Sequence, residues 1–158
     1  AFNAEESFGF TVALQVIEVD LLRGGENHDL LQAHHRAKFL RLLEEVCDGC
    51  LSAPPCNTHT RARHSGFPGP GPVRDSTWPR GRPDLTPAEV KAVSDANILA
   101  DYAIQAMALA EAKGTFCLLE FPADLARTPR GTPASSWQIP FDETVGKHVI
   151  GYRCDLSR

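Results

Sequence analysis

Two side chains are candidates for covalent chemistry, Cys56 and Glu120. Cys56 follows Pro54 and Pro55, whose rings restrict the backbone, and a nucleophile needs a fixed backbone. A thiol reacts as its thiolate, so nearby positive charge favours the reaction. Three such side chains follow within seven residues: His59, Arg61 and Arg63. We therefore expect Cys56 to be a nucleophile, and the alternative is a structural role, which is common for an isolated cysteine.

Acidic side chains occur where predicted strands end. Glu18 and Asp20 follow the first predicted strand, Asp29 comes soon after them, and Glu120 follows the third. Ligands of parallel α/β sheets bind at the carboxyl ends of the strands, so these acids are candidates for binding. The alternative is that such acids cap the next helix, and this alternative is weighed equally for Asp29.

The apolar runs predict the elements that would position these residues. Strands are expected at residues 14–20, 48–53 and 115–120, and a fourth near 148–154. Helices alternate with these strands, a pattern typical of the α/β class with a parallel sheet and helices on both faces. A chain of 158 residues corresponds to a single domain, residues 1–158.

Two helices are expected between the strands. The second begins at a capping box formed by Thr86 and Glu89, with Pro87 at its first position, and ends at Gly114. The first follows Asp29 and repeats apolar residues at spacings of three and four. Its predicted buried face consists of Ala33, Ala37, Leu40, Leu43 and Val46.

A long loop rich in Pro, Gly and Arg covers residues 61–87. From Gly66 to Pro87, ten of 22 residues are Gly or Pro, so no regular structure is expected there. Between Arg61 and Pro83 five Arg and one Asp give a local charge of +4, so the rest of the chain must sum to −8 to reach the net −4. We expect this loop to contact the phosphates of a polyanion, and the alternative is a solvated insert. The arginines are Arg61, Arg63, Arg74, Arg80 and Arg82.

Composition excludes several classes of protein. With 42% hydrophobic and 23% charged residues the chain is not a disordered tail, and it has no apolar run of the length that spans a membrane. Five cysteines without a secretion signal favour an intracellular, reducing compartment over a disulfide framework. Cys47 and Cys50 have zinc-ligand spacing, but no second close pair follows them, so we expect no metal.

Several segments together resemble one protein family. Ala53-Pro54-Pro55-Cys56 is similar to the Pro-Cys motif of cytosine-5 DNA methyltransferases, and Leu119-Glu120-Phe121-Pro122 is similar to their Glu-Asn-Val motif. The stronger likeness is to the methyltransferase-like domains of eukaryotic mobile elements. Those domains combine a Pro-Pro-Cys-Ser-Thr-type segment, a Pro-rich stretch with Arg and Trp, and a later Leu-Glu-Asn-Pro. Five motifs in the expected order extend the resemblance over residues 14–156.

The resemblance implies a partial Rossmann-like sheet of the class I methyltransferase type and S-adenosylmethionine as the cofactor. It implies that Glu18 contacts the ribose of that cofactor and Asp29 its adenine. Asp20 and Pro54 would complete the cofactor site.

The resemblance also implies a reaction and a partner. Cys56 would attack carbon 6 of a cytosine that has left the DNA duplex, while Glu120 would protonate ring nitrogen 3. The arginines of the loop would then lie against DNA phosphates, which implies a nuclear location.

Two departures from the family support alternatives. The Gly-rich turn that holds the cofactor has no counterpart, so we expect the chain to be truncated at its N-terminus. Phe121 replaces Asn, whose amide would bond the loop that carries the nucleophile. An inactive relic that binds nucleic acid or a partner through the Arg-rich loop is the second hypothesis. A different cysteine enzyme, with Cys56 activated by His59 or His64, is the third.

Overall fold

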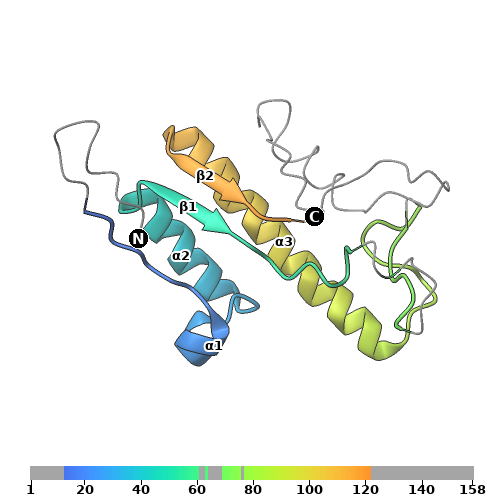
Figure 1. Cartoon of the computed structure of the whole chain (residues 1–158). Coiled ribbons are helices and arrows are strands. Elements are labelled where there is room, and N and C mark those ends of the chain that lie inside the picture. Colours follow the sequence, from blue (N-terminus) through green and yellow to red (C-terminus); the bar gives the residue numbers. More distant parts are fainter. Residues whose placement is uncertain (1–12, 61–62, 64–68, 76, 122–158) are drawn as a thin grey trace.

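The computed structural model describes residues 13–60, 63, 69–75 and 77–121 (Figure 1). In this part of the chain, short helical turns precede a helix–strand–helix–strand unit. The elements in chain order are α1 (Leu21–Gly24), the 3₁₀ turn η1 (Gly25–His28), α2 (Ala33–Glu45), β1 (Gly49–Ser52), α3 (Pro87–Lys113) and β2 (Phe116–Leu119).

The strands β1 and β2 form a two-stranded parallel sheet. Cys50 pairs with Cys117 and Leu51 with Leu118, and α3 makes the crossover that parallel strands require. The predicted strands at 48–53 and 115–120 are therefore confirmed, as is their parallel orientation. The larger Rossmann-like sheet stays an expectation.

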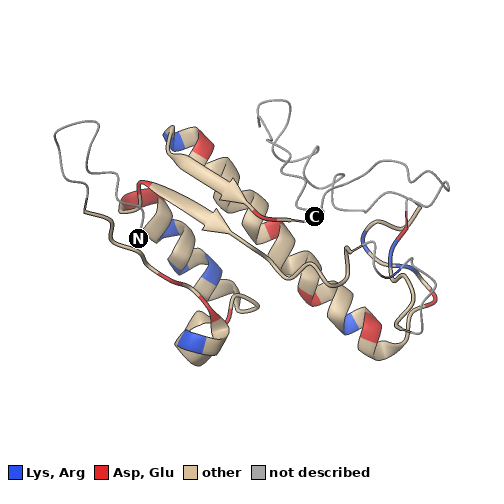
Figure 2. Cartoon of the chain, viewed as in Figure 1, with Lys and Arg blue, Asp and Glu red and all other residues tan. Residues whose placement is uncertain are grey.

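The crossover helix α3 begins and ends where the sequence indicates. The Thr86 hydroxyl accepts a hydrogen bond from the Glu89 backbone N–H, and the Glu89 carboxylate accepts one from the Thr86 N–H. Gly114 ends the helix in the left-handed conformation, with φ 68°. Between Asp101 and Glu111 the helix carries no charged residue (Figure 2). Its buried side chains are Val93, Ala96, Ala103, Ile104, Ala106, Met107 and Ala110.

The predicted buried face of α2 is only partly correct. Phe39 and Leu43 are buried, whereas Ala33, Ala37 and Val46 are exposed and Leu40 is intermediate. The large Phe39 ring buries more apolar area than an alanine and turns that side of the helix inward.

A single lysine joins the C-terminal end of α2 to α3. The Lys113 ammonium donates hydrogen bonds to the carbonyls of Leu43 and Cys47, both at 2.9 Å. A cation at this position satisfies the Leu43 carbonyl in the last turn of α2 and the Cys47 carbonyl just beyond the helix.

The two long helices, α2 and α3, lie on one side of the sheet. α3 packs against both strands, α2 packs against α3, and Figure 1 shows both helices behind the strands. The opposite face carries the exposed side chains of Leu51, Phe116 and Leu118. The expectation of helices on both faces is therefore not met by the part of the chain that the structure describes.

Residues 14–20 do not form the predicted strand. The sheet consists of β1 and β2 alone among the described residues, and Leu14 and Val16 are exposed. An apolar, β-branched run becomes a strand only where a neighbour accepts and donates its backbone hydrogen bonds. The segment instead leads to Asp20, which caps α1.

Other expectations concern the loop, the C-terminal part and the membrane. Residues 69–75 and 77–86 contain no helix or strand, as predicted. The expected strand near 148–154 lies outside the described residues. Of the helices that the structure describes, none has the length and apolar character needed to cross a membrane.

Candidate active site at the carboxyl ends of the strands

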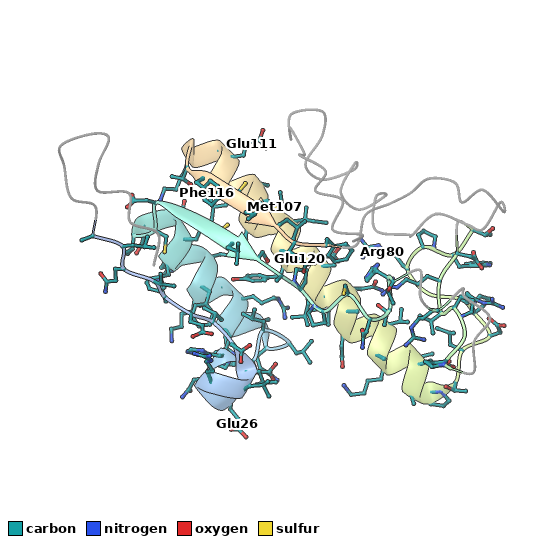
Figure 3. All side chains as sticks on the ribbon, in the orientation of Figure 1. Glu26, Arg80, Met107, Glu111, Phe116 and Glu120 are labelled. Carbon is teal, nitrogen blue, oxygen red and sulfur yellow. The ribbon has the colours of Figure 1, made fainter. Side chains whose placement is uncertain are left out.

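The carboxyl ends of β1 and β2 meet at one edge of the sheet. The Glu120 N–H donates a hydrogen bond to the Ser52 carbonyl at 2.9 Å, which continues the pairing one residue beyond β2. Glu120 itself is exposed, and Figure 3 places it at the end of β2. The main chain of Glu120 is thus held against β1, and its side chain is open to a ligand.

The link that leaves β1 carries the candidate nucleophile in a tight turn. The His59 N–H donates to the Cys56 carbonyl at 2.9 Å, and we call Cys56–His59 the nucleophile turn. Cys56 is half-buried, as is Pro54 in the link before it. Thr58 and His59 are buried, with 3% and 5% of their surface exposed, so the turn is anchored through its last two residues.

An aromatic contact connects this turn to the end of β2. The rings of His59 and Phe121 lie edge to face, with centroids 4.9 Å apart and planes at 64°. Phe121 directly follows Glu120, so the contact joins the turn bearing Cys56 to the backbone bearing Glu120. Phe121 thus contacts the turn through its ring.

A buried arginine holds the same turn from the other side. Only 4% of Arg74 is exposed, and its guanidinium donates to the Thr58 hydroxyl at 3.1 Å and to the Val93 carbonyl of α3 at 3.2 Å. It also donates to the Pro79 carbonyl at 2.8 Å and the Asn97 side chain at 2.7 Å. All four acceptors are neutral. Arg74 therefore links the nucleophile turn, the Pro-rich loop and α3.

Electrostatics at the turn follow from this buried cation. Burial, with smaller contributions from Arg80 and Arg63, lowers the pKa of Arg74 to about 10, so the guanidinium stays charged. Burial first, and the charge of Arg74 second, lower the pKa of His59 to about 3. His59 is thus a neutral imidazole at neutral pH, and neither ring nitrogen has a hydrogen-bond partner among the described residues.

The other arginines proposed for phosphate contact also have partners within the protein. Arg63 donates to the carbonyls of Asn57 and Gly71, at 2.7 and 3.0 Å. Arg80 forms two hydrogen bonds with Asp101, and Arg82 forms two with Asp84.

These contacts change the expectation for the basic loop. The expectation that Arg74 contacts phosphate is wrong for this structure, because its guanidinium is buried and cannot reach a phosphate. Arg63, Arg80 and Arg82 keep partly exposed side chains that already hold the loop in place. Arg61 lies outside the described residues.

The acids proposed for the cofactor have local partners too. Glu18 forms an exposed ion pair with Arg23 at 3.1 Å. Asp20 accepts hydrogen bonds from the backbone N–H groups of Leu22 and Arg23 and so caps α1.

Asp29 stabilises the turn that leads into α2. It accepts a hydrogen bond from the Leu31 N–H at 3.0 Å and one from the Gln32 side chain at 3.1 Å. These two bonds lower its pKa. The capping alternative thus describes Asp20 directly, and Asp29 acts one turn before the helix.

The three other cysteines of the described residues do not form a metal site. No group of three or more His, Cys, Asp or Glu side chains in the described ranges could hold an ion. Cys50 and Cys117 are free thiols that lie opposite each other on neighbouring strands. Burial, followed by the Cys117 and Cys47 thiols, raises the pKa of Cys50.

Two residues at this site were missed by reasoning from the sequence. Thr58 lies in the segment that resembles the Pro-Pro-Cys-Ser-Thr motif but was given no role, and Asn97 belongs to no motif; both matter because they accept hydrogen bonds from Arg74. The sequence signal for Arg74 was its charge, which predicts an exposed position. Comparisons of the chain with protein-family models, with curated proteins and with solved structures gave no match.

Proposed function

We propose that this chain is a cytosine-5 DNA methyltransferase-like domain in which Cys56 is the nucleophile and Glu120 the proton donor. One observation supports it most. The parallel pairing and the His59–Phe121 contact bring the turn with Cys56 and the residue next to Glu120 to one edge of the sheet. A nucleophile and an acid at a shared strand end can act on opposite sides of one reacting ring.

The proposed reaction requires both side chains. The Cys56 thiolate adds to carbon 6 of cytosine and forms a carbon–sulfur bond, while the Glu120 carboxyl gives its proton to ring nitrogen 3. The electron pair displaced from the 5,6 double bond makes carbon 5 nucleophilic. S-adenosylmethionine would supply the methyl group that carbon 5 takes up. A solvent water then takes the carbon 5 proton, which restores the 5,6 double bond and releases Cys56 as thiolate, and ring nitrogen 3 returns its proton to the Glu120 carboxylate.

The cofactor contacts reduce to one strong candidate. Asp20 and Asp29 use their carboxylates within the protein, as a cap and in a turn. Glu18 is held by an exposed ion pair, and such pairs contribute little, so ribose hydroxyls could replace it. We therefore propose Glu18 as the ribose contact, with Pro54 beside the nucleophile turn.

The contacts of the loop arginines argue against the hypothesis of an inactive relic that binds nucleic acid through them. It needs free arginines, whereas Arg74 is buried and Arg80 and Arg82 are paired with Asp101 and Asp84. DNA remains the proposed partner, through the base rather than through this set of arginines.

The test uses two DNA probes that trap a thiol. An oligonucleotide with pyrimidin-2-one in place of cytosine is more electrophilic at carbon 6 and reports thiol addition without methyl transfer. One with 5-fluorocytosine reports addition and methyl transfer together, because fluorine at carbon 5 blocks the elimination that releases Cys56. Covalent adducts are counted by denaturing electrophoresis and mass spectrometry.

We expect wild-type protein to form the pyrimidin-2-one adduct through Cys56. Cys56→Ser should abolish it and Glu120→Gln should slow it strongly, whereas the matched control Cys117→Ser should leave it intact. Little 5-fluorocytosine adduct is expected, because the sequence has no counterpart of the Gly-rich turn with which that family holds its cofactor. An adduct that survives Cys56→Ser and disappears with Cys117→Ser would overturn the assignment, as would the absence of any adduct with folded wild-type protein.

A further inference from the structure

The nucleophile turn is held at two points of different chemistry. On the side of α3, the Arg74 guanidinium donates a hydrogen bond to Thr58. On the side of β2, the His59 ring packs edge to face against the ring of Phe121. Since neither nitrogen of His59 has a hydrogen-bond partner among the described residues, packing rather than polarity fixes this side chain.

We propose that His59 and Phe121 are positioning residues, whose ring contact sets the place of Cys56 relative to Glu120. The inference rests on the proposed function for its meaning, because only a reaction that uses both groups needs them aligned. The geometry is local. His59 closes the turn on Cys56 through its backbone, and Phe121 follows Glu120 without an intervening residue. A shift of one ring therefore moves one reacting group.

The contact is suited to a neutral His59. The charged group that acts on the imidazole from the Pro-rich loop is Arg74, and a protonated ring would lie buried beside it. From α3, the Val93 carbonyl and the Asn97 side chain accept hydrogen bonds from Arg74, and neither group is charged. At the end of β2 the titratable residue is Glu120, which is exposed and is not among the groups that shift the pKa of His59. Acid should therefore loosen the contact.

The first test measures the position of Cys56 through its access to a thiol reagent. Dithiodipyridine reacts in mild acid as well as at neutral pH, and peptide mass spectrometry assigns the modified cysteine. Phe121→Leu keeps an apolar side chain and removes the ring, whereas Phe121→Tyr keeps the ring. Cys117, within β2, is the internal control for general unfolding.

We expect Phe121→Leu to speed the modification of Cys56 about fivefold, which corresponds to about 1 kcal/mol of lost positioning. Phe121→Tyr should restore the wild-type rate, and Cys117 should react at the same rate in all three proteins. Equal rates for Cys56 in wild type and Phe121→Leu would overturn the inference. So would a parallel rise at Cys117, since the contact would then serve general stability.

The second test uses acid and a ring that cannot ionise. Between pH 7 and pH 4.5 the rate at Cys56 relative to Cys117 should rise in wild type, and His59→Phe should abolish this rise. A rise that persists in His59→Phe would refute the role of His59.

Adduct formation on the same variants separates the two proposals. If Phe121→Leu lowers the rate constant for the pyrimidin-2-one adduct without weakening the noncovalent binding of the oligonucleotide, both stand. If wild type forms no adduct while the Cys56 labelling pattern holds, the methyltransferase proposal fails and the contact still places the turn. If wild type forms the adduct and Phe121→Leu matches it in adduct rate and labelling, the positioning inference fails and the function stands.

Discussion

Lowering the pH should destabilise this protein through His59 in a range where most carboxyl groups are still ionised. The pKa of His59 is about 3 in the folded protein, against 6.5 for an ordinary imidazole. Between these values the unfolded chain binds a proton that the folded protein does not. The contribution of the neutral His59 to stability is therefore present well above pH 6.5 and is lost as the pH falls toward 3.

The size of the effect follows from the two pKa values. A one-unit difference is worth about 1.4 kcal/mol, so the loss approaches about 5 kcal/mol below pH 3. At pH 5 the unfolded imidazole is almost fully protonated and the folded one is not, and the free energy of unfolding falls by about 2 kcal/mol. Total stabilities of domains this size are about 5–15 kcal/mol, so the change is easily measured.

The assay is urea unfolding at pH 7.5 and pH 5, followed by far-ultraviolet circular dichroism, on wild type and His59→Phe. The quantity compared is the difference between the two pH values, so any constant effect of the new ring on packing cancels. Other groups with lowered pKa values contribute equally to both proteins: Asp29, Asp84 and Glu89. His34→Phe, at an exposed position on α2, is the matched control.

We expect wild type and His34→Phe to lose about 2 kcal/mol more than His59→Phe on going to pH 5. Equal losses in all three proteins would refute the reasoning. Nuclear magnetic resonance gives a second check: the His59 resonance is the imidazole signal that disappears in His59→Phe. If that signal titrates near pH 6.5 in the folded wild type, the reasoning is also refuted.

Three further predictions concern separate features. Arg74→Lys should lower the free energy of unfolding by about 3 kcal/mol, because an ammonium cannot reach the four acceptors of the planar guanidinium. The control Arg80→Lys, at a half-exposed ion pair, should change it much less. Equal effects of the two substitutions in urea unfolding would contradict this. Thr86→Ala should cost about 1 kcal/mol by removing the cap of α3, and an unchanged urea midpoint would count against the capping box. The raised pKa of Cys50 should make its alkylation by iodoacetamide at pH 8.5 slower than that of Cys47, and the reverse order by mass spectrometry would contradict it.

Local signals explain which elements could be predicted. The capping box of α3 and the glycine after it satisfy helix ends with side chains adjacent in the sequence, so both boundaries are legible. The short apolar runs of β1 and β2 were equally clear. Residues 14–20 carry the same pattern, and it failed because pairing depends on a neighbour that a local pattern does not specify.

The candidate site divides in the same way. Once the strands are parallel, Cys56 and Glu120 must both follow strand ends at one edge, so sequence reasoning could nominate them. The part played by Arg74 could not be predicted, because its acceptors are carbonyl and side-chain oxygens brought together only by folding. Charge alone indicated the surface, whereas four hydrogen bonds make burial tolerable.

The parallel pairing of β1 and β2 has a consequence for the order of folding. β2 begins at Phe116, 64 residues after β1 ends at Ser52, so the first sheet contact must close a loop of that length. Relative to a hairpin loop of about four residues, the closure costs about 2.5 kcal/mol more in chain entropy. α3 has a capping box at its start and a glycine at its end, so it can form earlier and shorten the distance between the strands. Substitutions at the cap of α3 should therefore slow refolding, whereas those in the sheet should mainly speed unfolding.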